Sequence, residues 1–194
     1  MKTSILIVVC LLIFTFSIGC RRTPGPAASP APTQGAPGAT NPAGATPDAV
    51  SSPSVVADEA SLVKAMGTEG TWIIIFTSDF STNKELVLEG EYTNGKKDDA
   101  GKDVIQRKIA LYTQDDKRNI TNRFTLTAPK LTVTSPMASI QHGTFKGDLV
   151  VSVDNFQLVD TTVEGNVYFT TDSAKTTFTM DENSKVTGKQ EVRK

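Results

Sequence analysis

One sequence pattern occurs twice in the second half of the chain, and this repeat limits the possible folds more than any other feature. Ser139–Val151 (SIQHGTFKGDLVV) and Gln157–Phe169 (QLVDTTVEGNVYF) align without a gap, at an offset of eighteen positions. Apolar positions remain apolar, so that Leu149 aligns with Val167. A unit this short cannot bury its own apolar face and must stack on copies of itself to form a core. The sequence therefore predicts a solenoid of stacked coils, in which Leu149 and Val167 are neighbours in the core.

The pattern continues on both sides of these two units. Leu131 and Val133 precede Leu149 and Val151 by the same offset, which adds one coil in the N-terminal direction. A last coil follows a small insertion at residues 173–175, and its members are Phe178, Met180, Val186 and Gly188, which align with Phe156, Leu158, Val163 and Gly165. Together with the strand patterns that precede the repeat, these units predict about six coils. At a strand spacing of roughly 4.8 Å, the stack would be about 30 Å tall.

Glycine recurs at one position of the pattern. Gly147 aligns with Gly165, and Gly188 occupies the same place in the last coil. A glycine inside a strand pattern marks a bend, or a close approach of two backbones that a side chain would obstruct. We therefore expect these three glycines to lie at a corner of the solenoid, where the chain turns from one face to the next.

Residues 1–19 have the features of a secretory signal peptide. The start is positively charged, Ile5–Phe16 is almost wholly apolar, and small residues precede Cys20. This apolar run is shorter than a membrane-spanning helix requires. The junction Ser-Ile-Gly-Cys, which ends at Cys20, resembles the bacterial lipobox, and the resemblance implies that Cys20 is lipidated and becomes the new N-terminus. Because Cys10 lies in the segment that would be removed, no disulfide is expected.

Two further regions differ sharply in composition. Residues 20–56 are rich in Pro, Ala, Gly, Thr and Ser, and such a segment is expected to be a disordered tether because it buries too little apolar surface to offset its ordering entropy. Residues 57–194 are long enough to form one domain with its own core. The chain has 20 basic and 21 acidic residues, and the basic ones are the more frequent before residue 57. The domain therefore lacks the basic surplus that nucleic-acid binding requires.

The start of the domain predicts one helix followed by strands. Asp58–Met66 begins with acidic residues, carries apolar residues on one face and is followed by Gly67. The continuous apolar run at residues 70–76 predicts a buried strand. Further strands are expected at residues 84–90, 107–112 and 123–126, with a loop at residues 92–106 and a charged turn at residues 114–118.

This order of helix, buried strand and second strand resembles the start of the pectate-lyase-like right-handed parallel β-helices, in which the helix covers the N-terminal end of the solenoid. Val163–Tyr168 (VEGNVY) also resembles the coils of the bactofilins, bacterial β-helices that form polymers. As a whole, Leu62–Lys194 is similar to an uncharacterised lipoprotein family of clostridia-like Gram-positive bacteria. The expected fold class is all-β, a short right-handed parallel β-helix with an N-terminal capping helix, preceded by a signal peptide and a disordered tether.

Polysaccharide lyases that resemble this fold use acidic calcium ligands and a basic residue along one sheet. The corresponding candidates in this chain are Asp148, Asp160, Lys146, Lys130 and Arg123. None of them lies in a motif that matches a lyase, and Asp148 aligns with Asn166 one coil later, as expected of a solvated corner. Without long side loops to form the walls of a groove, no enzymatic activity and no catalytic residue are expected.

Three other features could indicate a site, but each has a simpler interpretation. His142 is the only histidine, and no nucleophile motif accompanies it. Asn94–Asp103 contains three aspartates but lacks the carboxylate spacing of a calcium loop. Tyr92, Tyr112 and Tyr168 could line a sugar-binding face, although tyrosines in strands more often pack against the core. No metal and no cofactor are therefore expected.

Three functions remain open. The first is a membrane protein, anchored through lipid on Cys20 at the extracytoplasmic face of the cell membrane, whose solenoid is a non-catalytic binding or structural module of the cell envelope. A bactofilin-like self-assembling scaffold is the alternative, and a reduced carbohydrate-active β-helix protein is the third. End-to-end assembly needs apolar terminal coils, whereas a helix is expected at one end and polar residues 189–194 at the other. A monomer is therefore expected, with an envelope protein or a glycan as partner and no nucleic acid.

Overall fold

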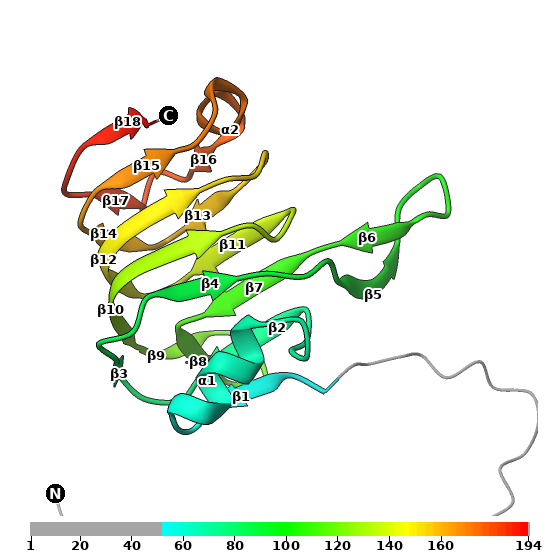
Figure 1. Ribbon diagram of the computed structural model, residues 1–194. Coiled ribbons are helices and arrows are strands. Elements are labelled where there is room, and N and C mark those ends of the chain that lie inside the picture. Colours follow the sequence, from blue (N-terminus) through cyan, green and yellow to red (C-terminus); the bar gives the residue numbers. More distant parts are fainter. Residues whose placement is uncertain (1–51, 194) are drawn as a thin grey trace, which may run out of the picture. The chain divides into compact units, whose positions relative to one another are not determined.

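The structure is a computed structural model that describes residues 52–193 (Figure 1). The predicted signal peptide (residues 1–19), the predicted lipidation site Cys20 and most of the predicted tether lie outside the described residues. The described part is all-β, with two short helices, α1 (Glu59–Met66) and α2 (Asp172–Thr177). Neither helix has the length and apolar character needed to cross a membrane.

Most strands belong to two parallel sheets. In order across sheet A, the strands are β1 (Ser54–Val56), β2 (Ile73–Phe76), β7 (Arg107–Ala110), β11 (Ala138–Gln141), β13 (Gln157–Val159) and β16 (Thr179–Met180). The strands of sheet B are β17 (Lys185–Val186), β14 (Thr162–Glu164), β12 (Thr144–Val151), β10 (Thr125–Val133) and β3 (Phe80–Ser81), joined by β4 (Leu86–Leu88), β15 (Val167–Phe169) and β18 (Gln190–Val192). The chain passes repeatedly from sheet A to sheet B and back, so that each strand pairs with the equivalent strand of the next pass (Figure 1).

The strand register follows the sequence repeat. In sheet A, Ser139 pairs with Gln157, and in sheet B, Leu149 pairs with Val167, both at the predicted offset of eighteen positions. Leu131 pairs in turn with Leu149, which places the preceding coil as predicted. A shift of one residue would turn the apolar side chains to the other face of the strand, so the alternating pattern fixes this register.

The core lies between the two sheets. Inward-facing side chains of both sheets are fully buried, among them Ile109 and Ile140 from sheet A and Leu131, Leu149 and Val167 from sheet B. Each apolar residue therefore packs on its equivalents in the coils before and after it. At about 25 cal/mol per Å² of buried apolar surface, such columns are the main source of stability in a stack of short strands.

The three corner glycines lie at a bend within sheet B and not, as expected, at a turn from one sheet to the other: Gly147 is inside β12, Gly165 lies between β14 and β15, and Gly188 lies between β17 and β18. Neighbouring coils approach too closely at this bend for a side chain. A Cβ atom at Gly165 would lie 2.0 Å from the carbonyl oxygen of Gly147, and one at Gly188 would lie 2.4 Å from that of Gly165. A Cβ atom at Gly147 would lie 1.9 Å from the Ala128 carbonyl oxygen, and the φ angle of Gly147 is +140°. Pro129 lies in the preceding coil at a register shift between β10 and β12. Close backbone contact therefore requires glycine at this corner.

Helix α1 matches its predicted limits and is tied to strand β7 by a buried arginine. Asp58 caps its N-terminus by accepting a hydrogen bond from the Ser61 N–H at 2.7 Å. At the other end, the fully buried guanidinium of Arg107 donates hydrogen bonds to carbonyl oxygens of the last turn, including that of Ala65 at 2.6 Å, and to that of Thr71. The negative end of the helix dipole thus balances a cation that has no carboxylate partner in the described part of the chain.

Two antiparallel hairpins leave the stack from a single coil, which corrects two expectations. The first hairpin consists of β5 (Thr93–Lys97) and β6 (Asp103–Ile105) and follows β4 along the chain, before β7. The second consists of β8 (Tyr112–Gln114) and β9 (Ile120–Arg123) and follows β7, before β10 (Figure 1). Residues 92–106 are therefore not a loop, and long side segments do exist. The polar sequence concealed the first hairpin, because both of its faces meet water and the Asp98 side chain sets its turn by accepting from the N–H groups of Ala100 and Lys102 at 2.9 Å.

The N-terminal boundary and the first strands also differ from expectation. β1 begins at Ser54 and pairs with β2, and Val56 is buried in the core, so the folded domain starts before the predicted boundary at Ala57. The apolar run at residues 73–76 is only half buried: Ile74 and Phe76 face the core, whereas its alternate residues lie on the outer face. The prediction that this strand is buried therefore holds for one face only, and the outer face of β2 carries the partly exposed Ile73 and Ile75.

The last coil follows the predicted alignment. Leu158 pairs with Met180 and Val163 with Val186, and the insertion before them is helix α2. Its inward-facing side chains are only partly buried, because no further coil covers them, and Met180 is 37% exposed.

Candidate functional site

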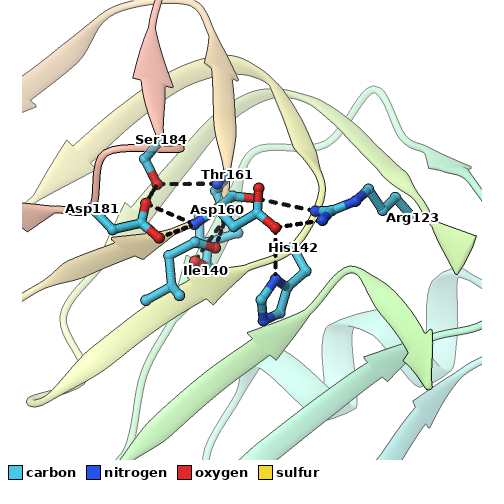
Figure 2. Close-up of polar contacts among 8 residues, drawn as sticks. Arg123, Ile140, His142, Asp160, Thr161, Asp181 and Ser184 are labelled. Atoms are coloured by element: carbon cyan, nitrogen blue, oxygen red, sulfur yellow. Dashed lines mark hydrogen bonds and ion pairs between the residues drawn. The ribbon is translucent and has the colours of Figure 1, made fainter. Parts of the chain in front are cut away.

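One polar cluster joins the corners of three successive coils (Figure 2). Its centre is the carboxylate of Asp160, which accepts a hydrogen bond from Arg123 Nη2 and lies 3.0 Å from His142 Nδ1. Arg123 ends β9, His142 follows β11 and Asp160 follows β13, so three distant segments converge on one acidic group. The side chains of His142 and Asp160 are about one quarter exposed, at 24% and 27%.

The backbone places His142 and Asp160 at equivalent corners. Both residues have positive φ angles, +58° and +48°, and they are separated by one full repeat of the sequence pattern. Positive φ is uncommon outside glycine, and Asn, Asp and His adopt it more readily than other residues do. The tight turn from sheet A to sheet B thus favours these residue types, and stacking brings their side chains together.

A second layer of hydrogen bonds holds Asp160 from the next coil (Figure 2). The N–H of Asp160 donates to both oxygens of the Asp181 carboxylate, at 2.9 and 3.0 Å. Ser184 donates its hydroxyl proton to Asp181 at 2.5 Å and accepts from the N–H of Thr161 at 3.1 Å. The buried hydroxyl of Thr161 lies 2.9 Å from the carbonyl oxygen of Ile140. The cluster therefore satisfies backbone groups that the tight corners leave without a strand partner.

These contacts favour the charged form of the acidic groups. Burial opposes ionisation of the Asp160 carboxyl, but hydrogen bonds from His142 and Arg123 outweigh it and lower its pKa. The hydrogen bond from the Ser184 side chain, followed by that from the Asp160 N–H, lowers the pKa of Asp181. Burial raises the pKa of Tyr112, whose ring meets the His142 ring edge to face at a centroid distance of 4.6 Å.

A histidine paired with an aspartate could move a proton, but the groups around it have other partners. His142 Nδ1 faces Asp160, and the ring packs against Tyr112. The described hydrogen bonds of His142 include none to a serine, threonine or cysteine side chain that could act as a nucleophile. Arg123 reaches Asp160 from the β8–β9 hairpin, so the geometry fastens this hairpin to the stack.

The other candidates from the sequence lie apart from this cluster. Lys130 pairs with Glu85 at 2.6 Å and Lys146 with Glu164 at 3.1 Å, both on the outer face of sheet B. Ion pairs of this exposed kind contribute little to stability. These lysines therefore do not converge with Arg123 and Asp160 on one site.

Asp148 and Asn166 correct the expectation of a solvated corner. Asp148 Oδ1 accepts from the N–H of Asn166 at 3.1 Å and from its Nδ2 at 2.9 Å. Asn166 Oδ1 in turn accepts from the N–H of Lys189 at 3.0 Å. The two side chains form a ladder beside the corner glycines, because equivalent positions in stacked coils lie within hydrogen-bond reach. The substitution of Asp by Asn along the repeat prevents two carboxylates from facing each other.

The three tyrosines do not share a face. Tyr92 stacks on the buried guanidinium of Arg107 at 4.0 Å, and its hydroxyl donates to the Gly67 carbonyl oxygen at 2.9 Å. Tyr168 belongs to sheet B, and the centre of its ring lies 3.5 Å from the Cζ atom of Arg193. Tyr112 packs on the ring of His142. These three tyrosines thus do not form a continuous surface for a sugar chain.

The aspartate-rich segment at residues 94–103 is the β5–β6 hairpin, and Lys97 pairs with Asp103 at 2.6 Å. In the part of the chain that the structure describes, no group of three or more potential ligands among His, Cys, Asp and Glu is arranged to hold a metal ion.

Two parts of this arrangement were missed in the sequence. The pairing of His142 with Asp160 has a signal there, because the repeat aligns the two residues. The burial of Arg107 has none, since Arg107 begins a strand whose pattern is compatible with a solvated cation.

No protein-family model, curated protein or solved structure matches this chain.

Proposed function

We propose that this chain is a lipid-anchored protein of the extracytoplasmic face of the cell membrane, and that its domain is a non-catalytic binding or structural module of the cell envelope. The observation that carries the proposal is the apolar run followed by Ser-Ile-Gly-Cys, which ends at Cys20. A diacylglyceryl group on this cysteine supplies two acyl chains, which is sufficient for stable anchoring where a single chain is not.

The architecture proposed for the domain is a short right-handed parallel β-helix of about six coils with α1 as its cap. Support comes from the parallel pairing of successive passes and from the offset of eighteen positions at which β11 pairs with β13 and β12 pairs with β14 and β15. Connections that return to a parallel strand of the same sheet are nearly always right-handed.

The non-catalytic assignment is supported by the way the polar groups are used. Asp160, His142 and Arg123 bind one another, and Asp148 binds Asn166, so these candidates stabilise corners of the stack. A reacting group that must also accept a substrate proton needs a free lone pair or a mobile partner.

The last coil bears on the choice between a monomer and a scaffold. Its strands are short, and the polar side chain of Gln190 occupies the position that pairs with Val167. Short, polar edge strands discourage pairing with another chain, which supports a monomer. The partial exposure of inward-facing apolar side chains of the last coil, Met180 and Val186 among them, favours end-to-end contact instead, and light scattering after size exclusion at rising concentration distinguishes the two.

Replacing Cys20 by alanine tests the anchor. The native chain should appear in the membrane fraction and incorporate a labelled fatty acid, whereas Cys20→Ala should lose the label and be released or remain unprocessed. Cys10→Ala is the matched control and should behave as the native chain does. Normal processing and unchanged membrane attachment of Cys20→Ala would contradict lipidation.

A further inference from the structure

The outer face of sheet A carries an apolar strip beside the β8–β9 hairpin. Val55, Ile75 and Ala110 pair across β1, β2 and β7, and their side chains alternate with those of the core. Val55 is 50% exposed, whereas Ala110 is already covered, at 2% exposed. Ile73 lies two residues before Ile75 on the same face of β2. Such a strip would expose apolar surface to water unless another group covered it.

The strip forms the floor of a small cavity. Its volume is about 240 Å³, and its lining residues are Ile73, Ile75, Ala110, Tyr112, Thr113 and Gln114. None of these side chains is acidic or basic. The cavity is smaller than the sites of drug-sized ligands, which occupy roughly 300–1,000 Å³, so an aliphatic chain of about eight carbons suits it better than a larger ring system.

A cation without an ion-pair partner lies at one end of this strip. Lys108 pairs with Ile73 across the strands, and its side chain lies on the outer face, with Nζ 5.6 Å from the centre of the Trp72 ring. Lys108 forms no ion pair within residues 52–193, whereas Lys97 on the neighbouring hairpin is paired with Asp103.

The surroundings of Lys108 disfavour its charged form, which an anion beside it would stabilise. Its side chain is half-buried, and burial together with the like charge of Lys96 lowers its pKa. A negatively charged group placed between Lys96 and Lys108 would relieve both effects. Lys108 pairs with Ile73, and from Ile73 to Ile75 the strand β2 advances about 6.6 Å, so an anion bound at Lys108 could extend its apolar part over Ile75 into the cavity.

We propose that this face binds a small amphiphilic anion, a carboxylate with an aliphatic tail, whose head group pairs with Lys108 and whose tail lies on Ile73 and Ile75 beside Tyr112. The proposal commits to a soluble amphiphile rather than a membrane surface. The β5–β6 hairpin beside the cation carries Asp98, Asp99 and Asp103 among its lysines and would not be drawn to an anionic bilayer as a basic patch is.

Trp72 is the only tryptophan of the chain, and its fluorescence therefore reports directly on this face. The full chain with Cys20→Ala, purified without detergent, is titrated with octanoate. Saturable change in the Trp72 emission is expected. Three compounds should each bind at least about tenfold more weakly: acetate lacks the tail, octanol lacks the charge, and octyltrimethylammonium carries the opposite charge. The reason is that a lost contact of about 1.4 kcal/mol changes the dissociation constant tenfold.

Matched variants locate the binding. Lys108→Gln should weaken octanoate binding about tenfold without weakening octanol binding, and Ile75→Ser should weaken both. Lys97→Gln, on the same hairpin as Lys96 but engaged with Asp103, is the control and should bind as the parent does. The circular dichroism of each variant is compared with that of the parent. If Lys108→Gln is not folded, Lys96→Gln is used in its place. Because Lys96→Gln removes a positive charge that acts on Lys108, it should weaken octanoate binding by a smaller factor.

Several results would overturn the proposal. They are the absence of saturation with octanoate, equal affinity for octanoate and octyltrimethylammonium, or unchanged affinity of folded Lys108→Gln. Binding to phosphatidylglycerol vesicles but not to octanoate would also refute it and would identify the face as a membrane contact.

Discussion

Replacing Gly165 by alanine should destabilise the domain strongly, because the added methyl group has no room. Its Cβ would lie 2.0 Å from the Gly147 carbonyl oxygen, whereas ordinary contact begins at 3.4 Å, so the two coils would have to move apart by the difference. Hydrogen bonds that cross this corner would break, including that from Asn166 Nδ2 to Asp148 at 2.9 Å. With the bonds from the Asn166 N–H to Asp148 and from the Leu149 N–H to the Asn166 carbonyl oxygen, three bonds at about 1 kcal/mol each give a loss of about 3 kcal/mol.

Gly101 provides the matched control. It lies at the tip of the β5–β6 hairpin with φ +75°, and a Cβ there would meet nothing within 4 Å. Gly101→Ala therefore carries only the cost of a positive φ, about 1 kcal/mol. Urea denaturation followed by circular dichroism measures both free energies of unfolding. If Gly165→Ala cost no more than Gly101→Ala, close contact between the coils would not be the reason for glycine at the corner.

Three further predictions follow from the core, the capping helix and the acidic groups. Val167→Asp buries a carboxylate against Leu149 and should cost several kcal/mol, leaving the protein insoluble or unfolded in circular dichroism; soluble, folded protein would contradict the predicted stacking. Arg107→Met leaves carbonyl oxygens of α1 without donors and should cost roughly 2–4 kcal/mol in urea denaturation, whereas a cost below about 1 kcal/mol would show that these bonds contribute little. The folded-state pKa values of Asp160 and Asp181 lie below the ordinary value of 3.8, so the stability that these carboxylates contribute is complete above about pH 5 and is lost as the pH falls through the folded pKa. The urea midpoint should therefore drop in acid, and Asp160→Asn should reduce that drop.

Asn166→Asp shows how the structure changes an expectation from sequence. An outward-pointing corner residue would tolerate this substitution at well under about 1 kcal/mol. In the structure, however, the new carboxylate would face Asp148 and remove the donor that now bonds to it at 2.9 Å. We therefore expect a loss of about 1–2 kcal/mol in urea denaturation that diminishes when Asp148 is protonated in acid. A loss that is the same in acid and at neutral pH would contradict a direct contact between the two carboxylates.

The sequence alone determined the register of the strands within residues 131–169 and the limits of helix α1. A constant offset of eighteen positions with alternating apolar residues admits only one alignment in which Leu149 and Val167 both face the core, and the strands pair in that alignment. Helix α1 was equally predictable, because the signals at Asp58 and Gly67 are local and need no information about distant segments. Both are properties of neighbouring residues or of a repeated spacing, which a single sequence contains in full.

Only the tertiary structure decided which distant side chains meet. Arg107 is buried because the end of α1 lies over its strand, and Arg123 reaches Asp160 because the β8–β9 hairpin folds toward that corner. The β5–β6 hairpin escaped prediction for a related reason: both of its faces are solvated, so its strands carry no apolar alternation. The position of Lys108 beside an apolar strip likewise depends on where the hairpins leave the stack. Contacts between segments that share no repeat spacing leave no pattern in one sequence, whereas the contact of His142 with Asp160 follows the repeat spacing and does have a signal there.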